Sequence, residues 1–382
     1  MQEHEVRGIT LSISTNSSVN EKLRPRVGFV SYWGRGRGQA YLSLSYVKML
    51  QVDYDIYILK QGDHPIAPEF TIVKVNVTSV PNYQIDEAVF RMWITENKLD
   101  YVVLSEYKQW YDDDKDLRLI CKEMGVKCFG ILVLERLNKE CAKYYDRILC
   151  STITSERAMR LSKVRNFSYA PYGVDLRESP SADIKKSSKF TFLHVGGFGG
   201  AQERKNTRVV IDAFRKLHKE DTKLIISMQA DYLNDYKFAE EDTWMIDCIK
   251  FIRRDLSRQD LINLYHISDC VVLPSKWETI GIPILEALAA GKPVVTTNAA
   301  PMNEFIKPGL NGYLCAANLL DYEGISILAA EVDVDSLANN MESVMNPVLY
   351  PTLAKNARQS IEKNYNIEYC AKFIKNIFKG EY

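Results

Sequence analysis

Residues 270–295 read CVVLPSKWETIGIPILEALAAGKPVV, and this stretch decides the fold class. Its first four residues form an apolar run that is typical of a buried strand, and a loop follows at 274–281. Pro283 suits the first turn of a helix, because its ring fixes φ and it has no N–H, and Gly291 suits the position just past the helix end. A second apolar run at 293–297 predicts the next strand. This order of strand, loop, helix and strand predicts a βαβ unit of a parallel sheet.

The same alternation extends over most of the chain. In the first half we expect strands at 26–32, 52–59, 70–77, 100–104, 126–134 and 146–150, and helices at 40–50, 86–97 and 117–124. In the second half we expect strands at 190–195, 224–228 and 249–252, and helices at 207–219, 259–266, 335–345 and 367–378, the last set apart by a loop. The sequence therefore predicts an α/β protein with two Rossmann-like, doubly wound domains that face each other across a cleft.

The length fits two such domains, because 382 residues exceed what a single hydrophobic core usually supports. We expect a flexible N-terminal tail at 1–24, and a polar stretch that contains Ser and Pro at 179–188 marks the domain boundary. The first domain is then expected at 25–178 and the second at 179–365. We expect the C-terminal helix, within 366–382, to pack back on the first domain.

Composition narrows the class of partner and the compartment. There are 49 Lys and Arg and 49 Asp and Glu, so the net charge is zero, which argues against nucleic acid as a partner. The eight cysteines include no C-x-x-C pair, which argues against structural zinc and favours a reduced, intracellular protein. We see neither a secretory signal pattern nor 18 consecutive apolar residues, so we expect a cytoplasmic protein.

The loop at 274–281 has the features of an anion site. Gly281 lets the backbone approach a ligand closely, and the helix that follows directs its first N–H groups at the loop, which favours phosphate. Glu278 in the loop and Glu286 one turn into the helix can face the same crevice. Two glutamates with this spacing prove little alone, but the whole order of strand, Pro-Ser, Glu, Gly, Pro, Glu and Gly is much more specific.

This segment resembles the E-x7-E signature of the family 4 glycosyltransferases, with Glu278 and Glu286 as its two glutamates. The likeness continues through Glu304 and residues 311–314, and APYGVD at 170–175 is similar to the family's P-x-G-V-D element. The resemblance implies the two-Rossmann glycosyltransferase-B (GT-B) fold, an active site in the interdomain cleft, and retention of the anomeric configuration.

The resemblance also implies roles for individual residues. Glu286 would bind the ribose hydroxyls of a nucleotide-sugar donor, Glu278 would contact the transferred sugar, and the amides of Gly281 and Ile282 would bind the diphosphate. In a second glycine-rich segment, 195–206, Lys205 fits the family's catalytic lysine.

The arginine that accompanies this lysine in the family is displaced here. Its position falls near Gly197, which we expect at the donor site, so either Arg204 supplies the charge or the cation is missing. A cation beside the leaving diphosphate would lower the barrier by several kcal/mol.

The loop WGRGRGQA at 33–40 resembles the family's glycine-rich loop that faces the donor phosphates and the acceptor, and Gly38 is the best match. Arg35 and Arg37 either reach an anionic substrate or are solvated loop charges. Many family members carry a histidine at the end of a later strand of the first domain, whereas here none occurs between His64 and His194. Glu135 lies in the equivalent region, and it either takes the acceptor-side role or forms a helix cap or salt bridge.

Taken together, these residues predict a retaining glycosyltransferase that uses a nucleotide-diphosphate sugar. The resemblance to the family favours a UDP-sugar over a GDP-sugar as the donor. We expect no obligatory cofactor and no metal, and we interpret Asp112, Asp113 and Asp114 as structural. The acceptor is a glycan, a lipid-linked molecule or a small molecule, and lipid-linked acceptors would bring peripheral membrane contact. Two alternatives remain: a nucleotide-sugar epimerase of the same architecture, and a catalytically silent scaffold, which the missing histidine favours.

Overall fold

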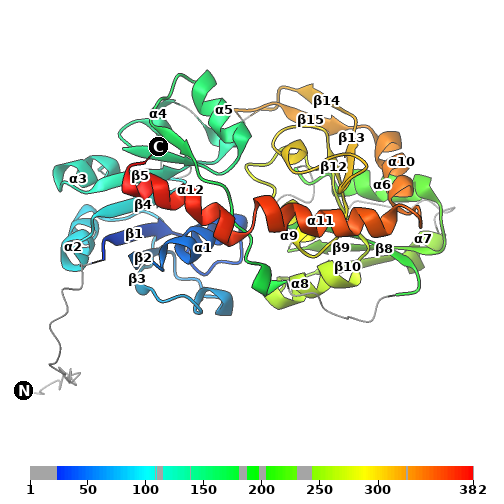
Figure 1. Cartoon of the computed structure of the whole chain (residues 1–382), viewed down its shortest axis with the longest axis horizontal. Coiled ribbons are helices and arrows are strands. Elements are labelled where there is room, and N and C mark those ends of the chain that lie inside the picture. The colour runs from blue at the N-terminus through cyan, green and yellow to red at the C-terminus, as the bar shows by residue number, and fades with distance from the viewer. Residues whose placement is uncertain are drawn as a thin grey trace, which may run out of the picture.

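The computed structural model describes residues 24–107, 109, 115–137, 139–179, 187–197, 204–229, 243–323 and 326–381. The N-terminal tail, apart from its last residue, and most of the boundary stretch at 179–188 lie outside these ranges, as do Asp112, Asp113 and Asp114. The described chain forms two α/β units that lie side by side (Figure 1).

The first domain is built on a parallel sheet with seven strands in the described part of the chain. In sheet order these are β3 (Asn76–Val80), β2 (Asp55–Gln61), β1 (Arg26–Ser31), β4 (Tyr101–Ser105), β5 (Lys127–Ile131), β6 (Arg147–Cys150) and β7 (Phe167–Tyr169). Its helices are α1 (Gly38–Leu50), α2 (Glu87–Asn97), α3 (Leu117–Glu123), α4 (Lys139–Ala142) and α5 (Ile153–Leu161). The order 3-2-1-4-5-6 of the first six strands is that of a Rossmann fold.

The second domain repeats this arrangement with a six-stranded parallel sheet. In sheet order its strands are β10 (Ile249–Arg253), β9 (Thr222–Met228), β8 (Phe190–Gly197), β11 (Cys270–Leu273), β12 (Val294–Thr297) and β13 (Gly312–Cys315). Its helices are α6 (Thr207–Leu217), α7 (Thr243–Cys248), α8 (Arg258–Ile267), α9 (Ile282–Ala289) and α10 (Val334–Val344), and β14 (Ala317–Leu320) pairs antiparallel with β15 (Ala329–Val332). Numbered within this domain, the strand order is again 3-2-1-4-5-6, so the predicted pair of Rossmann-like domains is confirmed.

The apolar runs of the sequence form the central strands because both faces of each sheet are covered. All four residues of β11 are buried, and so are five of the six in β1. Continuous burial of this kind is expected for parallel strands that lie between two layers of helices. The strands therefore end on a shared edge, where loops are free to carry polar groups.

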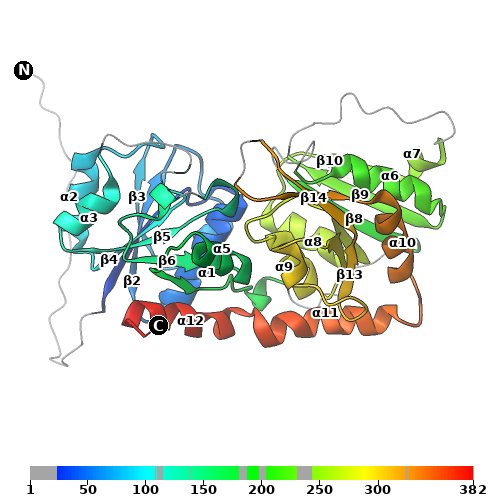
Figure 2. The same cartoon turned by 90° about the horizontal axis from the view of Figure 1, so that it is seen from above.

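Two segments cross between the domains, and they are hydrogen-bonded to each other. The first passes through Val174, and the second is the short link between α11 (Tyr350–Asn364) and α12 (Ile367–Lys379). The amide of Val174 donates to the Tyr365 carbonyl at 2.8 Å, and the Ile367 amide donates to the Val174 carbonyl at 3.0 Å. Figure 2 shows α11 along the second domain and α12 continuing along the first, where α12 packs against α1.

Three predicted elements differ from the structure. The strand expected at 70–77 is replaced by a short 3-10 turn, η1 (Pro68–Phe70), followed by β3 at Asn76–Val80, because Pro68 favours a turn. The strand expected at 126–134 ends at Ile131 and gives way to a second turn, η2 (Leu134–Arg136). The loop expected before the last helix is largely the helix α11.

Within the described residues, no helix combines the length and the apolar character needed to cross a membrane. All eight cysteines are buried, and none forms a disulfide.

Candidate functional site

A pocket of about 330 Å³ opens between the two domains, and both of them line it. Ten of the eleven residues predicted for the site line this pocket: Arg37, Gly38, Glu135, Gly197, Arg204, Lys205, Glu278, Gly281, Ile282 and Glu286. The eleventh, Arg35, does not, because its side chain lies over the ring of Tyr83 and donates to the Tyr83 hydroxyl at 3.3 Å. The glycine-rich loop at 198–203 lies outside the described residues.

Two helix N-termini meet at this pocket from opposite domains. Helix α1 begins at Gly38 and α9 at Ile282, and neither has a side-chain cap. A Cβ at Gly38 would lie 3.7 Å from the Cδ1 of Ile282, an ordinary van der Waals distance, so the two helix starts lie close together. Gly281 adopts a left-handed conformation with φ of 86°, which L side chains rarely adopt. Uncapped N–H groups and two positive dipole ends make this position suitable for an anion.

Glu278 holds two cations at the pocket wall. Its carboxylate accepts hydrogen bonds from the Nζ of Lys205, from Nη1 of Arg204 at 2.7 Å and from the Ser275 hydroxyl at 2.8 Å. Burial acts to raise the pKa of Glu278, but the charges of Arg204 and Lys205 outweigh it and bring the pKa to about 2. Burial lowers the pKa of Lys205, and the charge of Glu278 opposes that change. Arg204 therefore stands beside Lys205 as a second cation at the pocket wall.

Glu286 is held by a different pair of donors. Its Oε1 accepts from Nη1 of Arg258, and its Oε2 accepts from the Tyr265 hydroxyl at 2.8 Å. The side chain of Glu286 is only 6% exposed, yet it lines the pocket. Because a carboxylate has about four lone-pair sites, these two bonds leave room for hydroxyl groups of a ligand.

Glu135 connects the first domain to the loop that carries Glu278. Its Oε2 accepts from the Thr279 hydroxyl, the hydroxyl oxygen of Thr279 accepts from the Leu134 amide at 3.3 Å, and the Glu135 carbonyl accepts from the Ser326 amide at 2.9 Å. The carboxylate thus takes part in an interdomain hydrogen bond, which is neither the helix cap nor the salt bridge that the sequence offers as its structural role. It also lines the pocket, as the acceptor-side role requires.

Sequence reasoning missed Arg258 and Tyr41, which also line the pocket. The guanidinium of Arg258 lies 4.9 Å from the centre of the Tyr41 ring, across the domain boundary. Nothing in the residues around Arg258 distinguishes it from a solvated first-turn arginine. One signal was available further along α1, where Lys48 is the only charged residue of the helix and is buried.

His194 lies behind the site and gives a testable pH dependence. Its Nδ1 is 2.8 Å from the Val272 carbonyl and its Nε2 is 3.0 Å from the Thr207 hydroxyl, an arrangement that fits the neutral ring. Burial lowers the pKa of His194 to about 4. As the pH falls below about 6.5, this histidine is therefore protonated in the unfolded chain but stays neutral in the folded protein. We expect the free energy of unfolding to drop by about 3 kcal/mol from this group between pH 6.5 and 4. Calorimetry at several pH values should show a shallower drop for His194→Gln, and equal pH slopes would contradict the assignment.

Two facing Rossmann-like domains with a charged pocket between them define the GT-B fold. Residues 178–347 match the family described as Glycosyl transferases group 1. Among curated proteins, the UDP-Gal:alpha-D-GlcNAc-diphosphoundecaprenol alpha-1,3-galactosyltransferase of Escherichia coli is 25% identical to this chain over 281 residues. The aligned region covers 69% of this chain and 64% of the relative. The chain thus spans less than two thirds of the length of that relative.

Solved structures show the same fold over nearly the whole chain. A glycosyltransferase from Rickettsia africae matches with a TM-score of 0.73 and 16% identity, covering 94% of this chain and 99% of its own. Anabaena Alr3699/HepE, in complex with UDP and glucose, matches with a TM-score of 0.68 and 15% identity, covering 93% of this chain and 100% of its own. At these identities the likeness establishes the GT-B fold alone.

Proposed function

We propose that this protein is a retaining glycosyltransferase of family 4 type that transfers a hexose from a nucleotide-diphosphate sugar, preferably a UDP-sugar, to an acceptor hydroxyl. The observation that carries the proposal is one pocket with two kinds of subsite. Arg204 and Lys205 stand at the wall with Glu278, and Glu286 lies one helical turn further along α9. A diphosphate calls for cations and a ribose for a hydrogen-bond acceptor, and this one pocket is lined by both.

The uncapped N-terminus of α9 and the two cations suit the diphosphate, and the carboxylate of Glu286 suits the ribose hydroxyls. The preference for UDP is supported by two relatives whose names carry it: UDP-Gal in the Escherichia coli enzyme and UDP in the Anabaena complex. The loop at Gly38 faces α9 from the first domain, where the acceptor would enter.

In the proposed reaction the acceptor oxygen bonds to the anomeric carbon on the face from which the diphosphate leaves. The bond between that carbon and the phosphate oxygen breaks, and the departing oxygen takes the acceptor's proton. Lys205, Arg204 and the α9 amides stabilise the charge that builds up on the diphosphate. Closure of the two domains over the bound donor would keep water from attacking in place of the acceptor.

A thermal-shift panel tests the donor class. UDP, GDP, ADP and their common sugar conjugates are each added without metal and then with magnesium. A ligand at about 100 times its Kd should stabilise the protein by about 2.7 kcal/mol, and we expect UDP and a UDP-sugar to do so. If GDP alone raises the melting temperature, the donor carries guanine in place of uracil. If none of the nucleotides raises the melting temperature, the silent scaffold replaces the enzyme as the best interpretation.

A further inference from the structure

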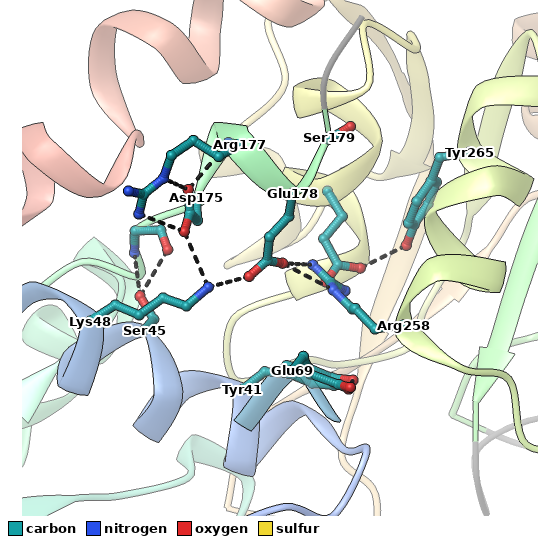
Figure 3. Close-up of polar contacts among 12 residues, drawn as sticks. Tyr41, Ser45, Lys48, Glu69, Asp175, Arg177, Glu178, Ser179, Arg258 and Tyr265 are labelled. Carbon is teal, nitrogen blue, oxygen red and sulfur yellow. Dashed lines mark hydrogen bonds and ion pairs between the residues drawn. The ribbon is translucent and has the colours of Figure 1, made fainter. Parts of the chain in front are cut away.

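A continuous chain of ion pairs runs from the pocket to the segment that joins the domains (Figure 3). It begins at Glu286, passes through Arg258 to Glu178 in the turn η3 (Leu176–Glu178), and continues through Lys48 to Asp175. Acidic and basic groups alternate along it. The side chains are between 5% and 21% exposed, so solvent screens these pairs much less than surface pairs.

Arg258 is the junction of this chain because one guanidinium serves two carboxylates. Its Nη1 donates to Glu286, and its Nε and Nη2 both lie 3.2 Å from the Oε2 of Glu178. Ser257 fixes the backbone at this point, because its hydroxyl caps α8 by accepting from the Asp260 amide at 3.0 Å. Burial acts to lower the pKa of Arg258, but the charge of Glu286 and smaller contributions from Tyr172, Glu178 and Tyr41 together outweigh it, so the pKa rises and the guanidinium stays charged.

The other half of the chain is held by one face of α1. Tyr41, Ser45 and Lys48 are spaced four and three residues apart, so they lie on the same side of the helix. Tyr41 lies under Arg258, and the hydroxyl of Ser45 donates to the Gly173 carbonyl at 2.8 Å. Lys48 bonds both Asp175, at 3.1 Å, and Glu178. This face of α1 therefore contacts the linker at Gly173 and Asp175, on either side of Val174, where the two crossing segments meet.

We propose that Arg258 is a positioning residue that couples the donor-binding carboxylate Glu286 to the interdomain linker through Glu178 and Lys48. The inference rests on the proposed function, in which Glu286 binds the ribose. A planar guanidinium offers its N–H groups in a fixed fork, so it holds Glu286 and Glu178 at one mutual distance. Rotation of the domains about the linker displaces Glu178, which reorients Glu286. Ribose binding and domain placement then favour each other.

Nucleotide affinity tests the positioning role without any need for an acceptor. UMP and UDP are used if the panel selects uracil, or the corresponding pair for another base. We expect Arg258→Lys, which keeps the charge but loses the fork, to weaken both nucleotides by about tenfold. The loss should be equal for the two, because the ribose is common to them. Wild-type protein should also prefer UDP over 2′-deoxy-UDP, and the variant should lose most of that preference.

The linker part of the proposal is tested by Glu178→Gln, because Glu178 lies outside the pocket lining. We expect a three- to fivefold loss of affinity for both UMP and UDP, by calorimetric titration of the full chain. The control is Arg160→Gln, which removes a charge from an exposed pair with Glu156 and should leave affinity unchanged.

Each result bears on a separate step. Wild-type affinity in Arg258→Lys, or a loss confined to UDP, would overturn the positioning role. A weakened Arg258→Lys beside an unaffected Glu178→Gln would overturn the coupling to the linker. If wild-type protein binds no nucleotide at all, the proposed function itself fails and this inference with it. Melting temperatures of the apo variants separate loss of binding from loss of fold.

Discussion

Replacing Lys205 with methionine is expected to lower turnover by about 10²- to 10³-fold, the loss found when one preorganised group that stabilises a developing oxyanion is removed. Methionine keeps most of the volume and the apolar stem but removes the charge. Glu278 would keep its bond to Arg204 at 2.7 Å and its bond to Ser275 at 2.8 Å, so the wall of the pocket should survive. Turnover is measured as release of the nucleoside diphosphate from the donor. This release accompanies transfer of the sugar to the acceptor or, more slowly, to water.

The matched control is Lys216→Met on the exposed side of α6, where Lys216 pairs with Asp335 at the surface. It makes the same substitution in the same domain and should leave turnover unchanged. Lys205→Arg should recover part of the lost rate, because it restores the charge with a different geometry. Affinity for the nucleoside monophosphate should stay close to wild type in Lys205→Met. Turnover within about threefold of wild type would refute the assigned role of Lys205, because removal of such a group costs far more.

The fold could be predicted from the sequence because the central strands of both sheets are apolar runs buried on both faces. Residues 270–297 show this most clearly, since β11, α9 and β12 each occupy the expected stretch with a glycine or proline at the boundaries. Helix α11 could not be found in the same way. Only Leu353, Ala357 and Ile361 are buried along its 15 residues, and a stripe of three apolar positions is hard to tell from chance.

The residues of the candidate site also divide into those that a local sequence pattern predicts and those that it does not. Residues near one another in the sequence, such as Glu278, Gly281 and Glu286, were predicted together because a local pattern contains them. The chain through Arg258, Glu178 and Lys48 joins residues that are 80 and 130 positions apart. Such pairings depend on how the two domains meet, and no spacing rule encodes that. A lysine that is the only charged residue of a largely buried helix, such as Lys48 in α1, indicates that a partner exists, but it does not identify which one.

Glu278→Gln is expected to have the largest effect on stability, a loss of about 3–5 kcal/mol in the free energy of unfolding at neutral pH. Glutamine keeps the shape of the side chain but removes the carboxylate that pairs with both Arg204 and Lys205, so the weaker attraction of Glu135 is left to oppose their charges. Lys205 is 7% exposed and Glu278 is 10% exposed, so water in the pocket compensates only in part for the lost carboxylate. Urea titration of the apo protein, followed by calorimetry, measures the loss.

The double variant Glu278→Gln with Lys205→Met separates this explanation from a general loss of packing. If the cost comes from an uncompensated buried cation, removing Lys205 as well should restore part of the stability, so the double variant should be more stable than Glu278→Gln alone. If the cost comes from packing, the second substitution should add to the first. Acid gives an independent check, because a carboxyl with a pKa of about 2 in the folded state stabilises the protein above its unfolded pKa near 4. That contribution should fade as the pH falls from about 4 towards 2 in wild-type protein, and Glu278→Gln should lack it.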